Sequence, residues 1–400
     1  MTEPEENVLT RKDKEFNRRE LTRSALIGGA SILFATEALP AAETPMNGST
    51  NGSVINARAF GATGDGKTTD TAALQKALDA AAQKGGAVFL PAGTYLTGEL
   101  HIRPSTSLIG IPTWSYRGPG ATVLRLAGAD SHCLLNLTDA AGASIEGLAL
   151  DGGGLGNSIH GLCTDRAEFG KQEDAFRIER CQVRRFSGDG AHLACVWCFS
   201  VRHSMFAENG GDGLNLRGWD GFLLDNWFSG NAGAGFAARR ENASITFTAN
   251  RIEWNRQENM LITGGNGYQI TGNFFDRAGA CGIALRKGNA PCTQITITGN
   301  FVKRSGKLAD AESHQSSQIL LDHAEGVTCI GNSLQSGADD GGGGLRTPSY
   351  GIVYEGLRNC VIRDNVLHDG ALKQLLVDLG GQGDGVIVGD NPGQLFTTRR

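Results

Sequence analysis

Hydrophobic and polar residues alternate over many short segments of this chain. The segments 268–273 and 295–300 read YQITGN and ITITGN, so in both an alternating stretch ends at an asparagine. Alternation with a period of two is typical of a strand that buries one face. Asparagines recur in this place at intervals of 24, 23, 27, 32 and 33 residues, namely at Asn226, Asn250, Asn273, Asn300, Asn332 and Asn365. A repeat of this length with short strands and glycine turns predicts the coils of a parallel β-helix.

The recurring asparagines predict a ladder of side chains at one turn of successive coils. Each amide can hydrogen-bond to the coils above and below, which satisfies backbone groups that the bend would leave unpaired. Some repeats are longer than a coil requires. Their surplus residues predict loops at 304–317 and 336–349, and an earlier loop at 152–174.

One segment, 70–84, has a strongly helical pattern. Its apolar face consists of Leu74, Ala77, Leu78 and Ala81. Asp70 is suited to the N-cap, and Gly85-Gly86 ends the helix. A short amphipathic helix cannot bury its apolar face alone, so we expect it to cover the open end of the β-helix.

A second strand recurs in each coil, for example GLNLR at 213–217 and GIALR at 282–286. Its second and fourth residues are mostly large and apolar, so they face inward and the fifth residue faces outward. Because coils are about 4.8 Å apart, the fifth residues form one continuous stripe. We call them the fifth-position column: Ala194, Arg217, Arg239, Thr263, Arg286, Asp322, Glu355 and Asp378.

Composition agrees with a large repetitive domain. Glycine accounts for 58 of the 400 residues but proline for only 10, which indicates many tight turns and close backbone stacking. A hydrophobic share of 40% and a charged share of 20% exclude a disordered chain. The net charge of −5 gives no electrostatic basis for binding nucleic acid.

Residues 1–42 have the order of parts of a signal peptide. Arg18-Arg19 precedes an apolar stretch at 25–35 that is too short to anchor in a bilayer, and small residues follow. The arginine pair resembles a twin-arginine signal. We therefore expect a bacterial protein exported to the periplasm or the medium, without membrane contact once the signal is removed. Residues 43–53 predict a linker, and 54–395 the β-helix domain. The nine irregularly spaced cysteines are interpreted mostly as buried thiols.

The start of the β-helix domain resembles a known superfamily. The segments AFGATGDGKTTD at 59–70 and GAVFLPAGTY at 86–95, with the helix between them, are similar to the N-terminal signature of pectate-lyase-superfamily proteins. These include polygalacturonase-related hydrolases, polysaccharide lyases, alginate epimerases and phage tailspikes. The resemblance covers about residues 54–395. It implies an all-β fold, a single-stranded right-handed parallel β-helix with an N-terminal capping α-helix.

The resemblance does not carry over a set of catalytic residues. Among the polygalacturonase motifs, only Asp339-Asp340 is a partial match, and it lies in a glycine-rich loop. The alginate epimerase motif Tyr-Gly-x-Asp-Pro-His is missing. The segment 187–192, SGDGAH, occupies a comparable turn without the proline.

Paired carboxylates make glycoside hydrolysis the first functional hypothesis. Asp322 and Glu355 are one coil apart, near the spacing of a retaining pair, and Asp378 is two coils from Asp322, nearer the inverting range. We therefore predict catalysis by Asp322, Glu355 and Asp378 on a polysaccharide substrate. Predicted substrate-binding residues are Arg217, Arg239, Arg286, His323 and Trp219.

Two other functions fit the same sequence. A lyase or epimerase specific for uronates would use the arginines on the sugar carboxylate, with Arg286 or His323 as base. We assign no cofactor and no metal ligand, although a lyase would be expected to hold Ca²⁺ at the acidic cluster. The third alternative is a non-catalytic carbohydrate-binding or structural solenoid, in which neighbouring arginines and acids merely pair at the surface.

Overall fold

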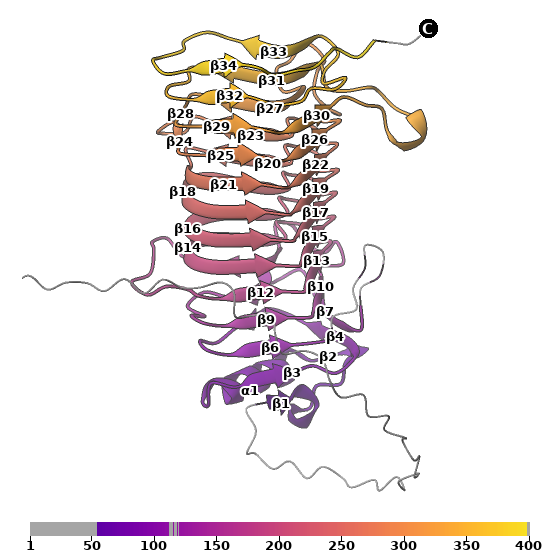
Figure 1. Ribbon diagram of the computed structural model, residues 1–400. Coiled ribbons are helices and arrows are strands. Elements are labelled where there is room, and N and C mark those ends of the chain that lie inside the picture. The colour runs from indigo at the N-terminus through magenta and orange to yellow at the C-terminus, as the bar shows by residue number, and fades with distance from the viewer. Residues whose placement is uncertain (1–53, 112–114, 116–117, 119, 398–400) are drawn as a thin grey trace, which may run out of the picture. The chain divides into compact units, whose positions relative to one another are not determined.

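The computed structural model describes residues 54–111, 115, 118 and 120–397, and the predicted signal peptide and linker lie outside the described residues. The described chain winds into stacked coils, each contributing parallel strands to three rows (Figure 1). One sheet of 23 strands bends around two sides and supplies the first and second rows, and an 11-stranded sheet is the third row. Every strand-to-strand pairing along the rows is parallel, as the repeat predicts.

The first row runs along the face that carries the fifth-position column. Its strands are β5 (Leu100–His101), β8 (Cys133–Asn136), β11 (His160–Thr164), β14 (Ala191–Arg202), β16 (Leu214–Leu224), β18 (Phe236–Thr248), β20 (Met260–Thr263), β23 (Ile283–Arg286), β27 (Ser317–Asp322), β31 (Tyr350–Glu355) and β33 (Gln374–Asp378).

The second row includes the later halves of β14, β16 and β18, which continue around the bend. Its other strands are β1 (Val54–Asn56), β3 (Ala87–Phe89), β6 (Ser107–Ile109), β9 (Ser144–Glu146), β12 (Arg177–Glu179), β21 (Asn266–Thr271), β24 (Cys292–Thr293), β25 (Thr296–Thr298), β28 (Ala324–Glu325), β29 (Thr328–Ile330), β32 (Val361–Arg363) and β34 (Ile387–Gly389).

The third row follows the asparagine turn in each later coil. Its strands are β2 (Asp65–Thr69), β4 (Gly93–Thr97), β7 (Thr122–Leu126), β10 (Ala149–Asp151), β13 (Gln182–Arg184), β15 (Met205–Ala207), β17 (Trp227–Ser229), β19 (Arg251–Glu253), β22 (Phe274–Asp276), β26 (Phe301–Lys303) and β30 (Ser333–Gln335).

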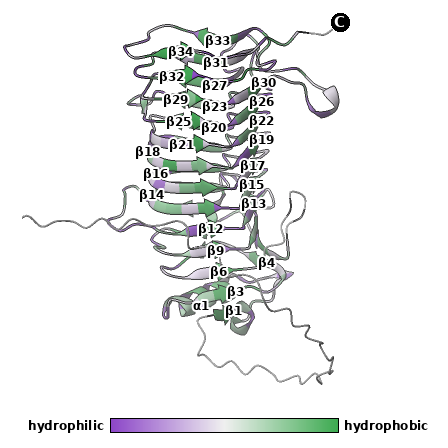
Figure 2. Cartoon of the chain, viewed as in Figure 1, coloured by the Kyte–Doolittle hydropathy of each residue, from purple (hydrophilic) through white to green (hydrophobic). Residues whose placement is uncertain are grey.

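The core follows from the alternation of side chains along these strands. Leu214 and Leu216 are buried, whereas Asn215 and Arg217 between and after them are not. Aromatic rings stack from coil to coil inside the stack, with Phe228 5.3 Å from Phe206 and 6.0 Å from Phe247 between ring centroids. Figure 2 shows the hydrophobic segments along the strands and in the elements at the N-terminal end of the stack. Glycines permit the tight stacking, since a Cβ on Gly213 would lie 2.5 Å from the carbonyl oxygen of Gly235.

The predicted capping helix is confirmed, with one correction. Helix α1 (Thr71–Ala82) buries Leu74, Ala77, Leu78 and Ala81 and packs against β1, β3 and β5 at the end of the stack. Asp70 stands at the N-cap position, but its side chain makes no capping hydrogen bond. Its carboxylate instead accepts from the backbone amides of Thr63 at 2.7 Å and Gly64 at 3.1 Å, and so fixes the preceding loop. The 3₁₀ helices η1 (Ala57–Phe60) and η2 (Asp340–Gly342) are short. No helix in the described residues has the length and apolar character that crossing a bilayer requires.

The predicted asparagine ladder is also confirmed. The side chain of Asn273 donates to Phe247 O at 2.9 Å and to Asn300 Oδ1 at 3.0 Å, and its Oδ1 accepts from the backbone amide of Asn250 at 2.9 Å. The same contacts continue along the stack to Asn391. A second ladder, which the repeat analysis missed, links Asn209, Asn231 and Asn255 at the next turn.

Replacing Asn273 with alanine is expected to lower the free energy of unfolding by about 1–3 kcal/mol. The substitution leaves buried backbone groups of Phe247 and Asn250 without partners, and each carries a desolvation penalty. Denaturant unfolding of the variant measures the loss. Asn289→Ala, at an exposed turn, is the matched control and is expected to stay within about 0.5 kcal/mol of the parent. Equal midpoints for the two variants would contradict a stabilising ladder.

Candidate active site

Three side chains from two adjacent coils converge on the outer surface of the first row. His160 begins β11, Asp189 lies in the turn before β14, and His192 is the second residue of β14. Parallel pairing of β11 with β14 places Cys163 beside His192, and so brings His160 to the level of Asp189. In this His–Asp–His cluster one ring nitrogen of each histidine and one carboxylate oxygen of Asp189 lie within 4.8 Å of one another.

Hydrogen bonds fix which nitrogen of each imidazole carries the proton. The backbone amide of Asp189 donates to Nδ1 of His160 at 2.9 Å, so a neutral His160 carries its proton on Nε2. Nδ1 of His192 lies 2.8 Å from Oδ2 of Asp189, and because a carboxylate only accepts, this nitrogen is the donor. The Nε2 atom of a neutral His192 is therefore left with a free lone pair that can accept a proton.

Burial separates the electrostatic roles of the cluster. The side chain of His160 is 13% exposed, that of Asp189 11%, and that of His192 37%. Burial lowers the pKa of His160 to about 4, so this ring is neutral at pH 7. Burial alone would raise the pKa of Asp189. Hydrogen bonds from His192 and from the backbone amide of Asp212 outweigh burial and hold this pKa below its ordinary value. The carboxylate is thus ionised and orients His192.

The lowered pKa of His160 predicts a dependence of stability on pH. The unfolded ring takes up a proton at its ordinary pKa of 6.5, whereas the folded ring resists protonation down to about 4. The unfolded state therefore binds more protons between these values, and stability falls as the pH drops through that window. Replacing His160 with glutamine should flatten this part of the profile, measured by denaturant unfolding above and inside the window. An unchanged slope would show that another group causes it.

An arginine-rich groove opens beside His192. It has a volume of about 600 Å³ and lies over the first-row strands β14, β16 and β18. Its polar lining residues are Arg166, His192, Asn215, Arg217, Arg239 and Arg240. Two predicted substrate-binding residues, Arg217 and Arg239, are thus placed in one groove with a potential base. Arg286, two coils further along, is not part of its lining.

The three predicted arginines are all ion-paired. Arg217 forms an ion pair with Glu241 at 2.8 Å, and Arg239 donates bidentate hydrogen bonds to the carboxylate of Asp212. Arg286 contacts Glu258 at 3.0 Å and Gln315 at 2.7 Å. The expected surface pairing therefore occurs, although Arg239 keeps 41% of its side chain exposed. Exposed Arg240 also lines the groove, and no ion pair within the described ranges of the chain reaches it.

The side chain of Trp219, a predicted substrate-binding residue, is half-buried beneath a loop. Its ring stacks on Phe169 with centroids 3.7 Å apart and planes 17° from parallel. Phe169 belongs to the loop between β11 and β12, which is also held by a hydrogen bond from Arg217 to Ala167 O at 3.1 Å. One face of the indole is therefore covered, and Trp219 anchors this loop beside the groove.

Two of the three predicted catalytic carboxylates, Asp322 and Glu355, lie side by side, and the third, Asp378, does not join them. Asp322 and Glu355 are paired residues of β27 and β31, and their side chains form a group with His323 whose ligand atoms lie within 4.8 Å. His323 Nδ1 is 2.5 Å from Asp322 Oδ1. Asp378 does not continue the column, because β33 pairs one residue out of the expected register and sets Asp378 opposite Tyr354. The carboxylate of Asp378 accepts from Gly380 and Gln382 instead.

The two late loops occupy different positions along the turn between the third and first rows. Gln315, in the loop 304–316, reaches Arg286 of the fifth-position column. The loop 336–349 instead contacts the turns that follow third-row strands. Asp340 contacts Arg277 and Arg304, and Asp339 contacts Lys307 at 3.0 Å, which ties this loop to the turns that follow β22 and β26. Asp339-Asp340 therefore anchors a loop rather than projecting from a first-row strand.

Sequence reasoning missed the His–Asp–His cluster. The segment 187–192 indicates a turn, but His160 lies in the preceding coil, which is lengthened by the loop at 165–176. The signal that could have found it is the residue just before each first-row glycine. In the three coils from β14 to β18 this residue is Asp189, Asp212 and Ala234, and one coil earlier it is His160.

Two family models match the chain in succession. Residues 54–121 match rhamnogalacturonase A/epimerase, pectate lyase-like, and residues 147–323 match the right-handed beta helix region. Together with the parallel coils and the one α-helix among the described residues, these matches define the class. The chain is a right-handed parallel β-helix protein with a pectate-lyase-like N-terminal region, as the sequence predicts.

Several relatives from Azotobacter vinelandii are named mannuronan C5-epimerases, and one is named an alginate lyase. The mannuronan C5-epimerase AlgE5 is 28% identical over 293 residues, which cover 68% of this chain and 26% of AlgE5. Alginate lyase 7 is 29% identical over 199 residues, which cover 44% of this chain and 22% of the relative. The matched region is thus a minor part of these longer proteins.

Solved structures show the same fold. The A-module of the Azotobacter vinelandii mannuronan C-5 epimerase AlgE6 superposes with a TM-score of 0.60 at 20% identity, covering 86% of this chain and all of that module. The catalytic unit of a GH87 α-1,3-glucanase from Streptomyces thermodiastaticus has a TM-score of 0.54 at 16% identity, covering 88% of this chain and 69% of its own. At these identities the likeness concerns the fold alone.

Proposed function

We propose that the protein modifies an acidic polysaccharide by removing the C5 proton of a uronate residue, as an epimerase or a lyase does. The observation that carries this proposal is the His192–Asp189 pair at the edge of an arginine-lined groove. Asp189 holds Nδ1 of His192 at 2.8 Å and leaves Nε2 as a free base. The named activities of relatives such as AlgE5 support the same chemistry. We therefore prefer it to the hydrolysis predicted from paired carboxylates.

The reaction places two demands on the site. The C5 hydrogen is adjacent to a carboxylate whose negative charge opposes formation of a carbanion, so cations must offset that charge in the transition state. Arg217, Arg239 and Arg240 line the groove and meet this demand. A base must then accept the proton, and Nε2 of His192 serves this purpose.

The roles of His160 and Asp189 follow from their contacts. The His160 ring centroid lies 4.6 Å from that of His192, so it packs against the base and limits its rotation. Because His160 stays neutral, it does not compete as a cation for the Asp189 carboxylate. Asp189 stabilises the imidazolium that forms when His192 takes the proton. Both are positioning residues in this proposal.

One carbanion leads to two products. Return of a proton to the opposite face of C5 gives the epimer, and expulsion of the C4 oxygen breaks the chain and leaves an unsaturated sugar. Incubation with polymannuronate, polygalacturonate and a neutral glucan distinguishes these outcomes. An epimerase changes the uronate composition without new chain ends, and a lyase gives an ultraviolet-absorbing product. Turnover of the neutral glucan alone would overturn the proposal.

Hydrolysis remains the second candidate, because Asp322 and Glu355 have carboxylate oxygens within 4.8 Å. Asp322 lies five coils from the level of His192, about 24 Å along the stack, so one sugar residue cannot contact both sites. Hydrolysis would release reducing ends without an unsaturated product. It would be abolished in the Glu355→Gln variant and retained when His192 is replaced.

Ca²⁺, which a lyase would be expected to hold, fits the Asp322–His323–Glu355 cluster poorly. Ca²⁺ takes six to eight oxygen ligands, whereas this cluster offers two carboxylates and an imidazole. The cluster thus lacks most of the oxygen ligands that this ion requires.

We also propose export of the folded chain by the twin-arginine route. Its nine cysteines, all without disulfides and eight of them buried, are compatible with folding before export.

A further inference from the structure

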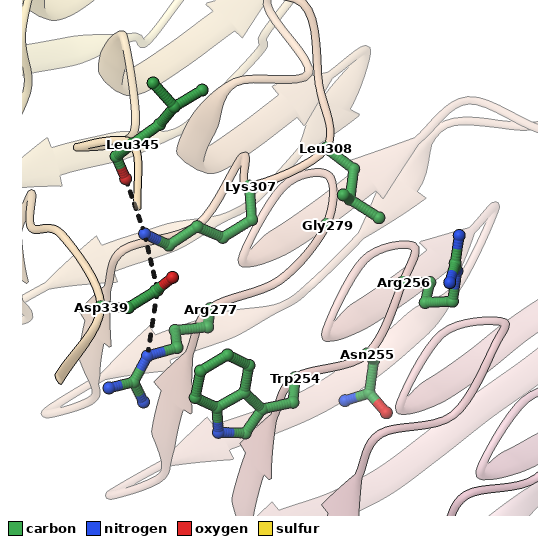
Figure 3. A pocket seen from close by; sticks show the side chains of 9 residues that line it. All are labelled: Trp254, Asn255, Arg256, Arg277, Gly279, Lys307, Leu308, Asp339 and Leu345. Carbon is green, nitrogen blue, oxygen red and sulfur yellow. Dashed lines mark hydrogen bonds and ion pairs between the residues drawn. The ribbon is translucent and has the colours of Figure 1, made fainter. Parts of the chain in front are cut away.

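A second hollow lies away from the arginine-rich groove, at the turns that lead from the third row to the first. It has a volume of about 290 Å³ and shares no lining residue with the groove (Figure 3). Trp254, Asn255 and Arg256 form one side of it, following β19. Lys307 and Leu308 of one late loop and Leu345 of the other form the opposite side.

Trp254 occupies a backbone position that disfavours a large side chain. Its φ is +60°, in the left-handed region that favours glycine. The equivalent residue of the preceding coil is Gly230, which follows the strand paired with β19 and has a φ of +68°. Glu208, Arg277 and Arg304 have the same left-handed φ at this turn in other coils, so the turn itself imposes the conformation. Among these turn residues Trp254 is the aromatic one, and the turn points its indole outward.

Arg277 packs on one face of the Trp254 indole, and the rest of the side chain is partly exposed. The guanidinium of Arg277 lies 4.2 Å from the Trp254 ring centroid, and its own side chain is only 3% exposed. Arg277 is fixed in turn by Asp276 at 2.6 Å. A cation stacked on one face makes the indole a rigid platform, and 43% of Trp254 remains exposed.

Leu308 and Leu345, one from each late loop, line the hollow beside the Trp254 indole. The backbone amide of Leu308 donates to Gly279 O at 2.8 Å, which positions the loop over the hollow. Lys307 joins the two loops, because its Nζ contacts Leu345 O at 2.9 Å and Asp339 Oδ1 at 3.0 Å (Figure 3). Leu308 and Leu345 are 64% and 77% exposed, so their side chains are presented to a ligand rather than to the core.

The charges that face the hollow favour an anion. Its lining holds Arg256, Arg277 and Lys307 against a single carboxylate, Asp339. Asp339 is already engaged by Lys307 and Arg277. Exposed Arg256 has no ion pair with any residue that the structure describes, and its guanidinium is available to a carboxylate or a similar anion.

We propose that this hollow is a second, non-catalytic binding site for one carboxylate-bearing sugar residue. The sugar ring stacks on the open face of Trp254 and its carboxylate pairs with Arg256, with Leu308 and Leu345 enclosing the ring. An open aromatic face, apolar walls and a free guanidinium are the complement of a uronate, which has one apolar face and one negative charge. The site would hold a polymer strand on the stack while another residue of a polymer occupies the groove.

The test counts binding sites by isothermal titration with a mannuronate hexamer and a galacturonate hexamer, a choice of probes that rests on the proposed function. Titrations use the His192→Gln background, so that turnover is too slow to disturb the binding measurement. We expect two sites per chain for at least one probe. Trp254→Gly and Arg256→Gln should each remove one site or weaken it at least about tenfold. Trp254→Gly should change the melting temperature little, because relief of the left-handed backbone offsets the lost stacking with Arg277.

Arg240→Gln is the matched control, since it changes an exposed arginine of the groove and should weaken the other site only. A stoichiometry and affinity unchanged by Trp254→Gly would overturn the proposal, as would equal binding of a neutral maltohexaose at this site. Failure of the proposed function appears elsewhere, as a lack of turnover by the parent protein with two binding sites intact.

Discussion

Replacing His192 with glutamine is expected to reduce turnover of a uronate polymer by about 10²–10⁴-fold. Glutamine preserves the approximate size of the side chain and can still donate to Asp189, but it has no nitrogen that accepts a proton at neutral pH. The loss should appear in kcat rather than KM, because the groove arginines that bind the substrate are unchanged. Product formation measured with the polymer in excess checks this.

His203→Gln is the matched control for this prediction. His203 is an exposed histidine in a turn of the same coil as His192, and its replacement should leave activity and melting temperature near those of the parent. An undiminished rate in His192→Gln would remove this residue from the mechanism. A large fall in melting temperature would instead assign it a structural role.

Replacing Asp276 with alanine is expected to destabilise the protein by about 3–5 kcal/mol. Asp276 closes β22 with a fully buried side chain, and it contacts Arg277 at 2.6 Å and Arg304 at 2.5 and 2.8 Å. Its removal leaves the two guanidinium groups with only the exposed carboxylate of Asp340 as a shared anion, and the loss of the buried charge partner costs more than the pairing itself contributes. The free energy of unfolding from denaturant titration measures the effect.

Gln335→Ala is the control for the buried network. Gln335 ends β30, at the position that Asp276 occupies in the third row two coils earlier, but it is only half-buried. Its replacement should change stability by about 0.5 kcal/mol or less. The Asp276 variant should also loosen the loop 336–349, because Arg277 and Arg304 hold that loop through Asp340. Similar losses in both variants would contradict an ionic anchor at Asp276.

The fold was predictable because its signals repeat. Asparagines at one turn, alternating strands and one amphipathic helix each specify a local structure, and all of them agree on one stack. The positions of Asn273 in the ladder and of Leu78 in α1 follow directly from these patterns. The second ladder at Asn231 was missed because its members are spaced by the same coils but follow no alternating strand.

The candidate site was predictable only in part, because it depends on register across loops of unequal length. A one-residue shift between β31 and β33 moved Asp378 out of the fifth-position column. The sequence also does not predict which charged side chains are buried. Asp276 is a charged residue at the end of a short strand, yet its side chain is fully buried and contacts Arg277 and Arg304. The partners of Trp219 and His160 come from an insertion and from another coil, and no local pattern records such contacts.

Solvent deuterium exchange tests the central claim most directly. Polymannuronate is incubated with the protein in D₂O, and the sugar products are examined by proton NMR. Removal of the C5 proton by His192 predicts loss of C5 hydrogen as deuterium enters the epimer, or an unsaturated product that lacks this hydrogen, and neither in the His192→Gln variant. New reducing ends with every C5 hydrogen retained, abolished by Glu355→Gln but not by His192→Gln, would contradict the account.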